Sequence, residues 1–179
     1  MLTIDPIELG NPKAHHYILG AIGPRPICFA STIDKKGVAN LAPFSFFNVF
    51  SSNPPIAIFS PARSGRTGKQ KDTYNNVKEI AEVVINLVNY NMVEQMSLAS
   101  SPYGSEIDEF TKSGFTPIAS ETIKPFRVKE SPVQMECEVF NVMELGDKGG
   151  AGNLIMCKIK KIHIQENILD ENNMIDQHK

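Results

Sequence analysis

Small or polar residues alternate with large apolar ones between residues 40 and 50, a pattern that could hold a flat ligand. The small or polar positions are Asn40, Pro43, Ser45 and Asn48, and the apolar ones are Leu41, Phe44, Phe46, Phe47 and Phe50. Backbone N–H and C=O groups beside small side chains can read the polar edge of a planar ligand, while aromatic rings cover its face. A phenylalanine-rich core strand with a turn would show the same pattern, and the residues alone leave both interpretations open.

A basic, glycine-containing stretch follows at residues 61–73, with the sequence PARSGRTGKQKDT. It carries four cationic residues and one acidic residue, although the whole chain has a net charge of −2. Cations, hydroxyls and a helix N-terminus together make a good anion site. The residues that would supply them are Ser60, Arg66, Lys71 and Thr73. The spacing is not that of a Walker P-loop, and a solvated basic loop is the alternative interpretation.

Strand signals surround both stretches. Runs of β-branched and apolar residues predict strands at residues 27–33, 38–44, 56–59 and 82–88. A turn at residues 34–37 joins the first two, because Gly37 can take the positive φ that a tight hairpin requires. Apolar and polar residues also alternate at 133–142 and 155–164, and each alternation slips phase once. Such slips indicate β-bulges in bent strands, with residues 146–152 as the hairpin loop.

Helix signals are fewer and shorter. They predict helices at residues 74–80, 92–99 and 106–112, with Asp72 or Thr73 as the first N-cap and Gly114 as the last stop. Pro6 and Pro12 interrupt any helix in residues 1–16, which we expect to be a loose lead-in, and residues 165–179 form a polar tail. Strands outnumber helices and no βαβ rhythm appears. Residues 1–179 are therefore predicted to form one mainly β domain built on an antiparallel barrel.

Composition excludes several classes of function. The net charge of −2 gives no basic field for nucleic acid, and no apolar run reaches the length of a membrane span. The first residues lack the basic start and apolar core of a secretory signal, so we expect a cytoplasmic protein. Cys28, Cys137 and Cys157 lie in apolar, strand-like contexts and are predicted to be buried free thiols.

The histidines and carboxylates suggest neither a hydrolytic centre nor a metal site. His15 and His16 are adjacent, so on an extended chain they would point to opposite faces. We predict that the histidines are solvent or capping groups and not ligands. No metal-ligand spacing, Ser-His-Asp set, carboxylate pair or Cys-His pair is present.

Several motifs occur in order along most of the chain. They are Pro24-Arg25-Pro26-Ile27, Ser31-Thr32-Ile33-Asp34, residues 40–47 (NLAPFSFF), Asn53-Pro54-Pro55 and Lys71-Asp72-Thr73. Over residues 17–164 this string resembles the flavin reductase-like family of FMN-binding split barrels. The resemblance implies an antiparallel Greek-key split β-barrel with short peripheral helices, and FMN as the cofactor.

The resemblance also implies a set of cofactor-binding residues. The segment that contacts the isoalloxazine ring in the family matches Asn40, Ala42, Pro43, Ser45 and Phe46. The phosphate would be held by Ser60, Arg66, Lys71 and Thr73, and Thr32 is a further cofactor-binding candidate. Arg25 either stabilises the charge that reduction places on the flavin or forms a structural salt bridge, and the sequence leaves both open. Because the flavin would carry the hydride chemistry, we name no catalytic side chain and no metal.

The implied function is an FMN-binding oxidoreductase that accepts hydride from NAD(P)H. It would pass electrons to flavin, oxygen or a partner monooxygenase. The competing hypothesis is a non-catalytic module that holds a flavin or a haem. Members of the family form homodimers with each flavin near the interface, and the apolar 44–50 stretch fits a two-fold dimer. We expect residues around Tyr103 and Phe110 to come near the partner's site. Members usually continue further than Lys179, so this chain is either shortened or naturally short.

Overall fold

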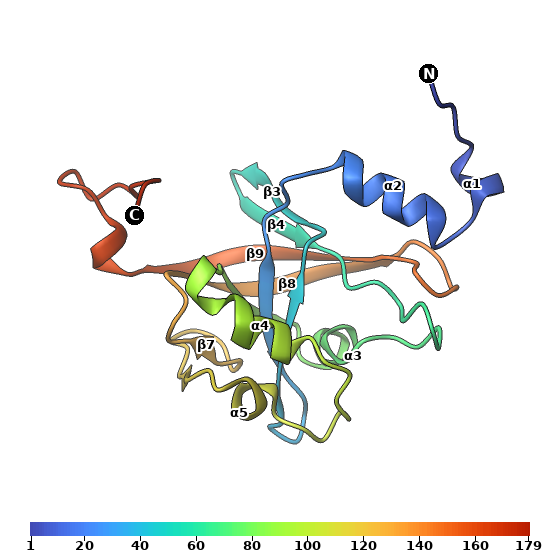
Figure 1. Ribbon diagram of the computed structural model, residues 1–179. Helices are drawn as coiled ribbons and strands as arrows, with labels where there is room; N and C mark the ends of the chain where they lie inside the picture. The colour runs from blue at the N-terminus through green and yellow to red at the C-terminus, as the bar shows by residue number, and fades with distance from the viewer.

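The computed structural model describes residues 1–179, and its centre is a seven-stranded antiparallel sheet (Figure 1). The strand order is β2-β1-β5-β8-β9-β4-β3, and β6 and β7 form a separate two-stranded sheet. The strands are β1 (Cys28–Ile33), β2 (Ala39–Phe44), β3 (Phe47–Ser52), β4 (Pro55–Phe59), β5 (Glu82–Asn86), β6 (Pro117–Ile118), β7 (Arg127–Val128), β8 (Val133–Glu144) and β9 (Asn153–Ile164). The predicted mainly β class is confirmed.

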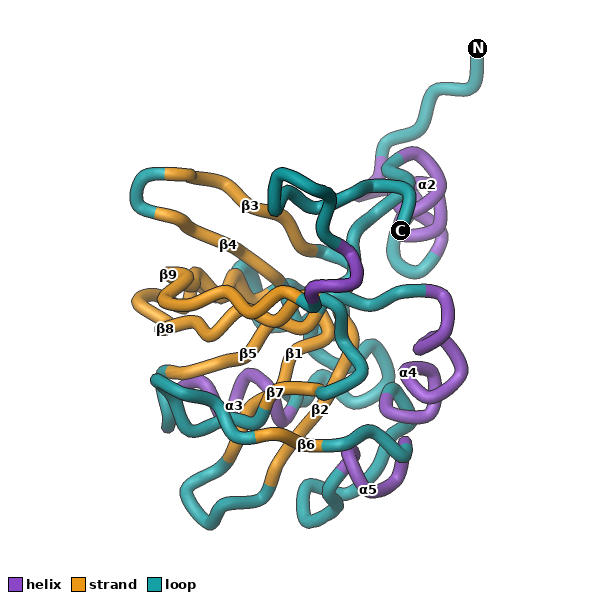
Figure 2. Tube along the Cα trace, turned by 90° about the vertical axis from the view of Figure 1, so that its left-hand side faces the viewer, coloured by secondary structure: helices purple, strands orange, loops and turns teal.

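The helices are short and lie outside the sheet, as predicted. They are α1 (Pro6–Leu9), α2 (Lys13–Ala21), α3 (Asp72–Glu79), α4 (Val93–Ala99) and α5 (Glu109–Ser113), with 3₁₀ turns at Tyr90–Met92 and Glu166–Ile168. The longest of them has nine residues, and none has the length and apolar character that crossing a membrane requires. In Figure 2, α2, α4 and α5 lie on one side of the curved sheet.

The two edge strands of the sheet, β2 and β3, are joined directly by residues 45 and 46. Because consecutive Cα atoms are about 3.8 Å apart, the end of β2 and the start of β3 lie within roughly 11 Å of each other. The sheet therefore curls until its edges approach at this connection. Figure 2 shows the curl, with β3 at one end of the strand series and β2 at the other.

The longest hairpin, β8–β9, contains both predicted bulges. The register shifts between Val139 and Asn141, and again between Glu136 and Cys137. The first shift leaves Phe140 as the extra residue of β8, and the second leaves Lys160 as the extra residue of β9. Each alternation slipped phase at these positions in the sequence, and a bulge turns one extra residue into such a slip.

Two apolar clusters pack on the sheet. The larger one has 12 buried residues, among them Cys28, Cys137 and Cys157. All three cysteines are free and buried, as predicted. The smaller cluster joins β1 and β2 to α4 and α5. Phe110 of α5 belongs to it and is 1% exposed, so its side chain packs in the core.

The amino-terminal region differs from the predicted lead-in, because residues 6–21 contain two helices. The carboxylate of Asp5 accepts hydrogen bonds from the N–H groups of Ile7 and Glu8, which makes Asp5 an N-cap. Pro6 then occupies the first turn, where its missing N–H costs nothing. His15 and His16 therefore lie on a helix and not on an extended chain, although both are exposed as predicted.

Two helix starts and one strand also differ from the prediction. Helix α3 begins at Asp72 with Lys71 as its N-cap, ahead of both expected N-caps, Asp72 and Thr73. Helix α5 begins at Glu109, not at residue 106, because the Asp108 side chain caps the N–H groups of Phe110 and Thr111. Strand β3 was not predicted as a strand of its own. Gly114 takes a left-handed conformation with φ 76° and ends α5, as expected.

Candidate functional site

A large cleft lies where the two edges of the sheet meet, and we call it the main cleft. Its volume is about 1210 Å³, compared with roughly 300–1,000 Å³ for ordinary ligand pockets. Its walls come from α1 and α2, the end of β2, the 60–73 loop and residues 99–103. Nine of the ten predicted site residues line it: Asn40, Ala42, Pro43, Ser45, Phe46, Ser60, Arg66, Lys71 and Thr73.

Thr32, the tenth predicted residue, does not line the main cleft. Its side chain is fully buried, and its hydroxyl oxygen accepts hydrogen bonds from Asn40 Nδ2 at 3.2 Å and Asn76 Nδ2 at 3.1 Å. Asn40 Nδ2 also donates to Thr73 Oγ1 at 3.0 Å. Thr32 therefore acts as an anchor that fixes Asn40 to the start of α3. A role for Thr32 in direct contact with a ligand is not supported by this geometry.

One edge of β2 faces the cleft side without a neighbouring strand, because β2 pairs only with β1. The N–H of Leu41 points away from β1 and donates to Glu109 Oε2 at 3.1 Å. Residues two apart in an antiparallel strand point their N–H groups the same way, so Pro43 occupies the next outward position. Proline is tolerated there because no ladder hydrogen bond is lost. Ala42 and Pro43 thus expose backbone with little side-chain bulk.

Three cations of the 61–73 stretch are free of side-chain partners. Arg66, Lys69 and Lys71 are exposed and make no salt bridge or side-chain hydrogen bond, whereas Arg63 pairs with Glu144 at 2.7 Å. Lys71 directly precedes α3, whose first N–H groups carry the positive end of the helix dipole. This end of the main cleft is therefore suited to an anion, as the sequence predicts.

The tip of the β8–β9 hairpin holds the 61–73 stretch from behind. Glu144 accepts from Arg63 and, at 2.6 Å, from Tyr74 Oη. These bonds lower the pKa of the Glu144 carboxyl, with the Tyr74 bond the larger cause. A Cβ at Gly149 would lie 2.9 Å from the Ser64 carbonyl oxygen. The hairpin backbone therefore packs directly on the loop backbone, which only glycine permits at this position.

Arg25 has a structural role that neither sequence alternative described. Its guanidinium donates to the carbonyl oxygens of Leu19 and Ile22, at the end of α2, and to Ser45 Oγ at 3.3 Å. It contacts no carboxylate and does not line the main cleft. The salt-bridge alternative is therefore wrong, and Arg25 instead fastens α2 to the β2–β3 connection.

Several residues of the main cleft are not among the predicted site residues. His15 lies on the α2 wall with its ring edge-on to Phe46, at a centroid separation of 6.2 Å. Tyr103 and Glu109 line the wall opposite the amino-terminal helices. They come from segments outside the motif string. Helical spacing in α2 is the one sequence pattern that could have placed His15 beside the cleft.

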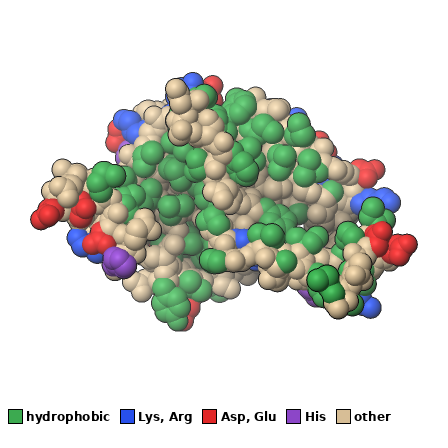
Figure 3. Space-filling model, turned by 90° about the horizontal axis from the view of Figure 1, so that it is seen from above, with side chains coloured by type: hydrophobic (Ala, Val, Ile, Leu, Met, Phe, Trp, Pro, Cys, Tyr) green, Lys and Arg blue, Asp and Glu red, His purple; other side chains and the backbone are tan.

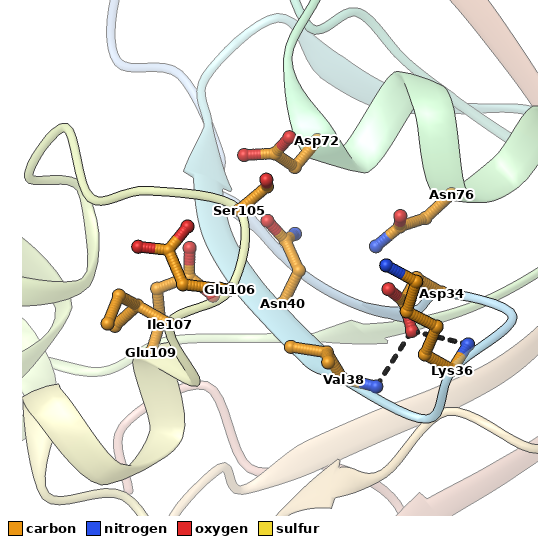
Figure 4. A pocket seen from close by; sticks show the side chains of 10 residues that line it. All are labelled: Asp34, Lys36, Val38, Asn40, Asp72, Asn76, Ser105, Glu106, Ile107 and Glu109. Atoms are coloured by element: carbon orange, nitrogen blue, oxygen red, sulfur yellow. Dashed lines mark hydrogen bonds between the residues drawn. The ribbon is translucent and has the colours of Figure 1, made fainter.

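A smaller cavity of about 160 Å³ adjoins the main cleft, and we call it the second cavity. Its lining residues are Asp34, Lys36, Val38, Asn40, Asp72, Asn76, Ser105, Glu106, Ile107 and Glu109 (Figure 4). Asn40, Asp72 and Glu109 line both spaces. Burial raises the pKa of Asp72 and, together with Asp72 and Asp108, raises the pKa of Glu109 to about 7.

Comparison with known proteins places this geometry in one family. The family model described as flavin reductase like domain matches residues 21–179. An uncharacterized protein of Aquifex aeolicus is 37% identical over 173 residues, which are 96% of this chain and 85% of the relative. Among solved structures, nitrilotriacetate monooxygenase component B from Bacillus cereus superposes with a TM-score of 0.91 at 30% identity, covering 98% of this chain and 86% of that one.

A second solved structure is named for a different activity. The 2-nitrobenzoate 2-nitroreductase of Pseudomonas fluorescens superposes with a TM-score of 0.84 at 27% identity, over 97% of this chain and 82% of that one. The family model covers every wall of the main cleft except α1 and most of α2, because these two helices lie before residue 21, where the match begins. The chain belongs to the flavin reductase-like family.

Proposed function

We propose that this chain is an FMN-binding oxidoreductase that takes hydride from NAD(P)H. The observation that carries the proposal is the main cleft, in which an open strand edge and a free cationic helix start share one space. A flavin mononucleotide has a flat ring with a polar edge and a phosphate of close to two negative charges. The cleft offers a matching partner for each part, so the residues present fit the group.

The side chains divide between these two parts of the cofactor. Backbone of Ala42 and Pro43 and the free O–H of Ser45 would face the ring edge, while Phe46 would cover part of its plane. Arg66, Lys71, the hydroxyl of Ser60 and the N–H groups at the start of α3 would hold the phosphate. Thr73 is 1% exposed and accepts from Asn40, so it would serve mainly to fix the helix start.

When bound, the flavin supplies the hydride and electron chemistry. The chain's own residues bind it, orient it and limit access of water through the α2 wall. One of these similar proteins is a monooxygenase component and the other is a nitroreductase. Their names are compatible with electron delivery to more than one acceptor. We propose that the electrons pass to free flavin, oxygen or a partner monooxygenase.

The proposal extends to assembly and compartment. We propose a homodimer, because Figure 3 shows hydrophobic side chains gathered on the face where β3, β4 and α2 lie. Val49 and Phe50 of β3 and Ile18 of α2 are among the exposed hydrophobic residues, and monomers rarely expose large contiguous apolar patches. Three buried free thiols fit a reducing compartment, and we propose the cytoplasm.

Reconstitution with FMN tests the proposed function. Purified protein should bind FMN, show a flavin absorption spectrum, and oxidise NADH or NADPH in a flavin-dependent reaction. Binding of FMN without any such oxidation would favour the alternative of a non-catalytic flavin module. A Soret band in protein exposed to haem, with no FMN binding, would instead identify a haem module and overturn the proposal.

A further inference from the structure

Glu109 is a buried carboxyl group that the proposed cofactor contacts leave unused. It is 8% exposed and lies at the start of α5, where its side chain lines both the main cleft and the second cavity. Oε2 accepts one hydrogen bond, from the N–H of Leu41 on the open edge of β2. Oε1 makes no hydrogen bond with any other residue. One carboxyl oxygen is thus fixed to the ligand-facing strand edge, and the other is free.

The second cavity connects this carboxyl with the molecular surface. Lys36, Ser105 and Glu106, which line it, are exposed residues, while Asn40 and Asn76 at its inner end are buried. Figure 4 shows Asn40 between the 105–109 segment and the residues of α3 and the 34–38 turn. The cavity is polar and large enough for several water molecules, each of which needs about 30 Å³. Water in it would join Glu109 to solvent.

Burial, with smaller contributions from the charges of Asp72 and Asp108, raises the pKa of Glu109 and keeps its proton available near neutral pH. The charged and titratable groups that line the two spaces are Asp34 and Lys36 of the turn, Asp72 of α3, Glu106 before α5, and His15, Arg63, Arg66, Lys69, Lys71 and Tyr103 of the main cleft. Asp108 lines neither space, but its charge also acts on Glu109. Strand β2 and α4 contribute no charged side chain to either space. Burial outweighs the Leu41 hydrogen bond, so the pKa of Glu109 is about 7.

We propose that Glu109 is the proton-exchanging group of the main cleft. This inference rests on the proposed function. Hydride from NAD(P)H carries two electrons and one proton, and a neutral reduced flavin requires one further proton. Glu109 gives that proton from its carboxyl group and becomes a carboxylate. Solvent returns a proton to the carboxylate through the second cavity, so each cycle consumes one hydride and one solvent proton.

Rapid-mixing reduction of the FMN-loaded protein tests this role. In the wild type, the rate of flavin reduction by NAD(P)H should fall as pH rises through about 7, where Glu109 loses its proton. Glu109→Gln keeps an acceptor for the Leu41 N–H, but its amide has no acidic proton to donate. Its rate of flavin reduction should be at least about a hundredfold lower below pH 7, at the low end of general-acid effects, and should be flat across this range.

Infrared spectroscopy of the protein without FMN gives a second readout that does not depend on activity. The wild type should show a protonated-carboxyl band that disappears with a midpoint near pH 7 and is missing from Glu109→Gln. Glu106→Gln is the matched control, because it removes an exposed carboxyl from the same cavity. That control should keep both the band and the pH profile.

The outcomes separate this inference from the proposed function. Failure of the wild type to bind FMN would overturn both. Binding of FMN with an unchanged rate and pH profile in Glu109→Gln would overturn the inference alone, as would loss of the profile in Glu106→Gln. If Glu109→Gln does not bind FMN, Glu109→Asp decides, because it keeps an exchangeable proton. A pH-dependent rate in the Asp variant supports the role, and a flat profile overturns it.

Discussion

The cationic residues of the 61–73 stretch do not share one role, although the sequence presents them alike. Arg63 forms an ion pair with Glu144 and fixes the loop to the β8–β9 hairpin. Arg66 and Lys71 remain exposed and without partners on the cleft side. Only a cation without a protein partner can give its full charge to a ligand. We therefore expect Arg66 and Lys71 to make the phosphate contacts.

Lys71→Ala should weaken FMN binding by roughly tenfold to a hundredfold. A charge-assisted hydrogen bond contributes about 1.5–3 kcal/mol, and each 1.4 kcal/mol changes an affinity by about tenfold. Riboflavin lacks the phosphate, so its binding should change little. Fluorescence titration of wild type and variant with both flavins measures the difference.

Lys129→Ala is the control for the Lys71 titration, because Lys129 is exposed and lies outside both cavities. It should bind FMN like the wild type. Equal losses for FMN and riboflavin in Lys71→Ala would point to a general structural effect. No loss for FMN would remove Lys71 from the phosphate site.

At the level of single residues, the sequence predicted those parts of the cleft lining that come from one continuous stretch of chain. Residues 40–46 and 60–73 were found because each set lies in one stretch with a recognisable chemistry. Thr32 was misplaced, since its neighbours in the fold, Asn40 and Asn76, satisfy its hydroxyl. Glu109 was missed, and Tyr103 was expected near a partner's site, because only the packing of α5 and the 99–103 segment against β2 brings them to this cleft.

At the level of elements, a buried carboxylate joins the 119–125 segment to the long hairpin. Glu136 of β8 is fully buried and accepts from the Thr122 hydroxyl and from the N–H groups of Glu121 and Thr122, and it contacts His163 Nε2 at 2.8 Å. Burial alone would raise its pKa. The hydrogen bonds outweigh burial and hold the pKa at about 2.

Glu136→Gln should destabilise the fold by about 3 kcal/mol near neutral pH, because it breaks a buried charged network. The depressed pKa stabilises the wild type above the ordinary glutamate pKa of about 4.3, and this contribution is lost as pH falls toward about 2. The variant should therefore lose less stability than the wild type over that acid range. Urea unfolding at several pH values measures both effects.

Glu138→Gln is the matched control for Glu136, since the two residues lie on the same strand. Glu138 is exposed and pairs with Lys160 at 3.3 Å on the surface. Its substitution should change the unfolding free energy by about 1 kcal/mol or less. A Glu136 variant as stable as this control would contradict the structural role of the buried network.

Gly149→Ala should separate the hairpin tip from the loop that it supports. The new Cβ would meet the Ser64 carbonyl oxygen at 2.9 Å and Gly65 backbone at 3.1 Å, and backbone cannot rotate away as a side chain can. We expect FMN affinity to fall several-fold and stability to fall by about 1–3 kcal/mol. Gly20→Ala, where the added Cβ meets nothing within 4 Å, should retain wild-type binding in the same titration.

Elements with a clear pattern were predicted well, whatever their length, whereas α2 and β3 were missed. Strands β8 and β9 show their alternation and even their bulges in the sequence. Helix α2 was hidden by Pro12, which sits just before its first residue and does not interrupt it. Strand β3 was hidden because its residues are mostly exposed, with a bulge between Val49 and Ser51, so it lacks the half-buried alternation of a central strand.

At the level of the whole molecule, the position of the main cleft follows from the strand order. Residues 45 and 46 connect the two edges of the sheet, so the curled sheet leaves its open β2 edge beside this connection. No local pattern contains the strand order, because it arises from pairings between residues far apart, such as β1 with β5. The sequence predicted an antiparallel β fold and the stretches that line the main cleft, but not the strand order that brings these stretches together.

The exposed apolar face over β3 gives the last prediction, which concerns the proposed homodimer. Phe50 of β3 is 66% exposed, and β3 is also an edge strand with unpaired backbone groups. Burial of such a side chain against a second copy contributes about 1.5–3 kcal/mol per subunit. Phe50→Glu should therefore shift the protein from dimer toward monomer, because each subunit would bring a charge to the contact.

Light scattering at micromolar concentration measures this shift. The wild type should have a mass of twice 19.8 kDa, and Phe50→Glu should approach the single-chain mass while its circular dichroism stays unchanged. Tyr90→Glu is the control, since Tyr90 is 90% exposed but lies in the turn before α4, away from β3. A wild type that is monomeric, or a Phe50 variant that stays dimeric, would show that this face is not the dimer contact.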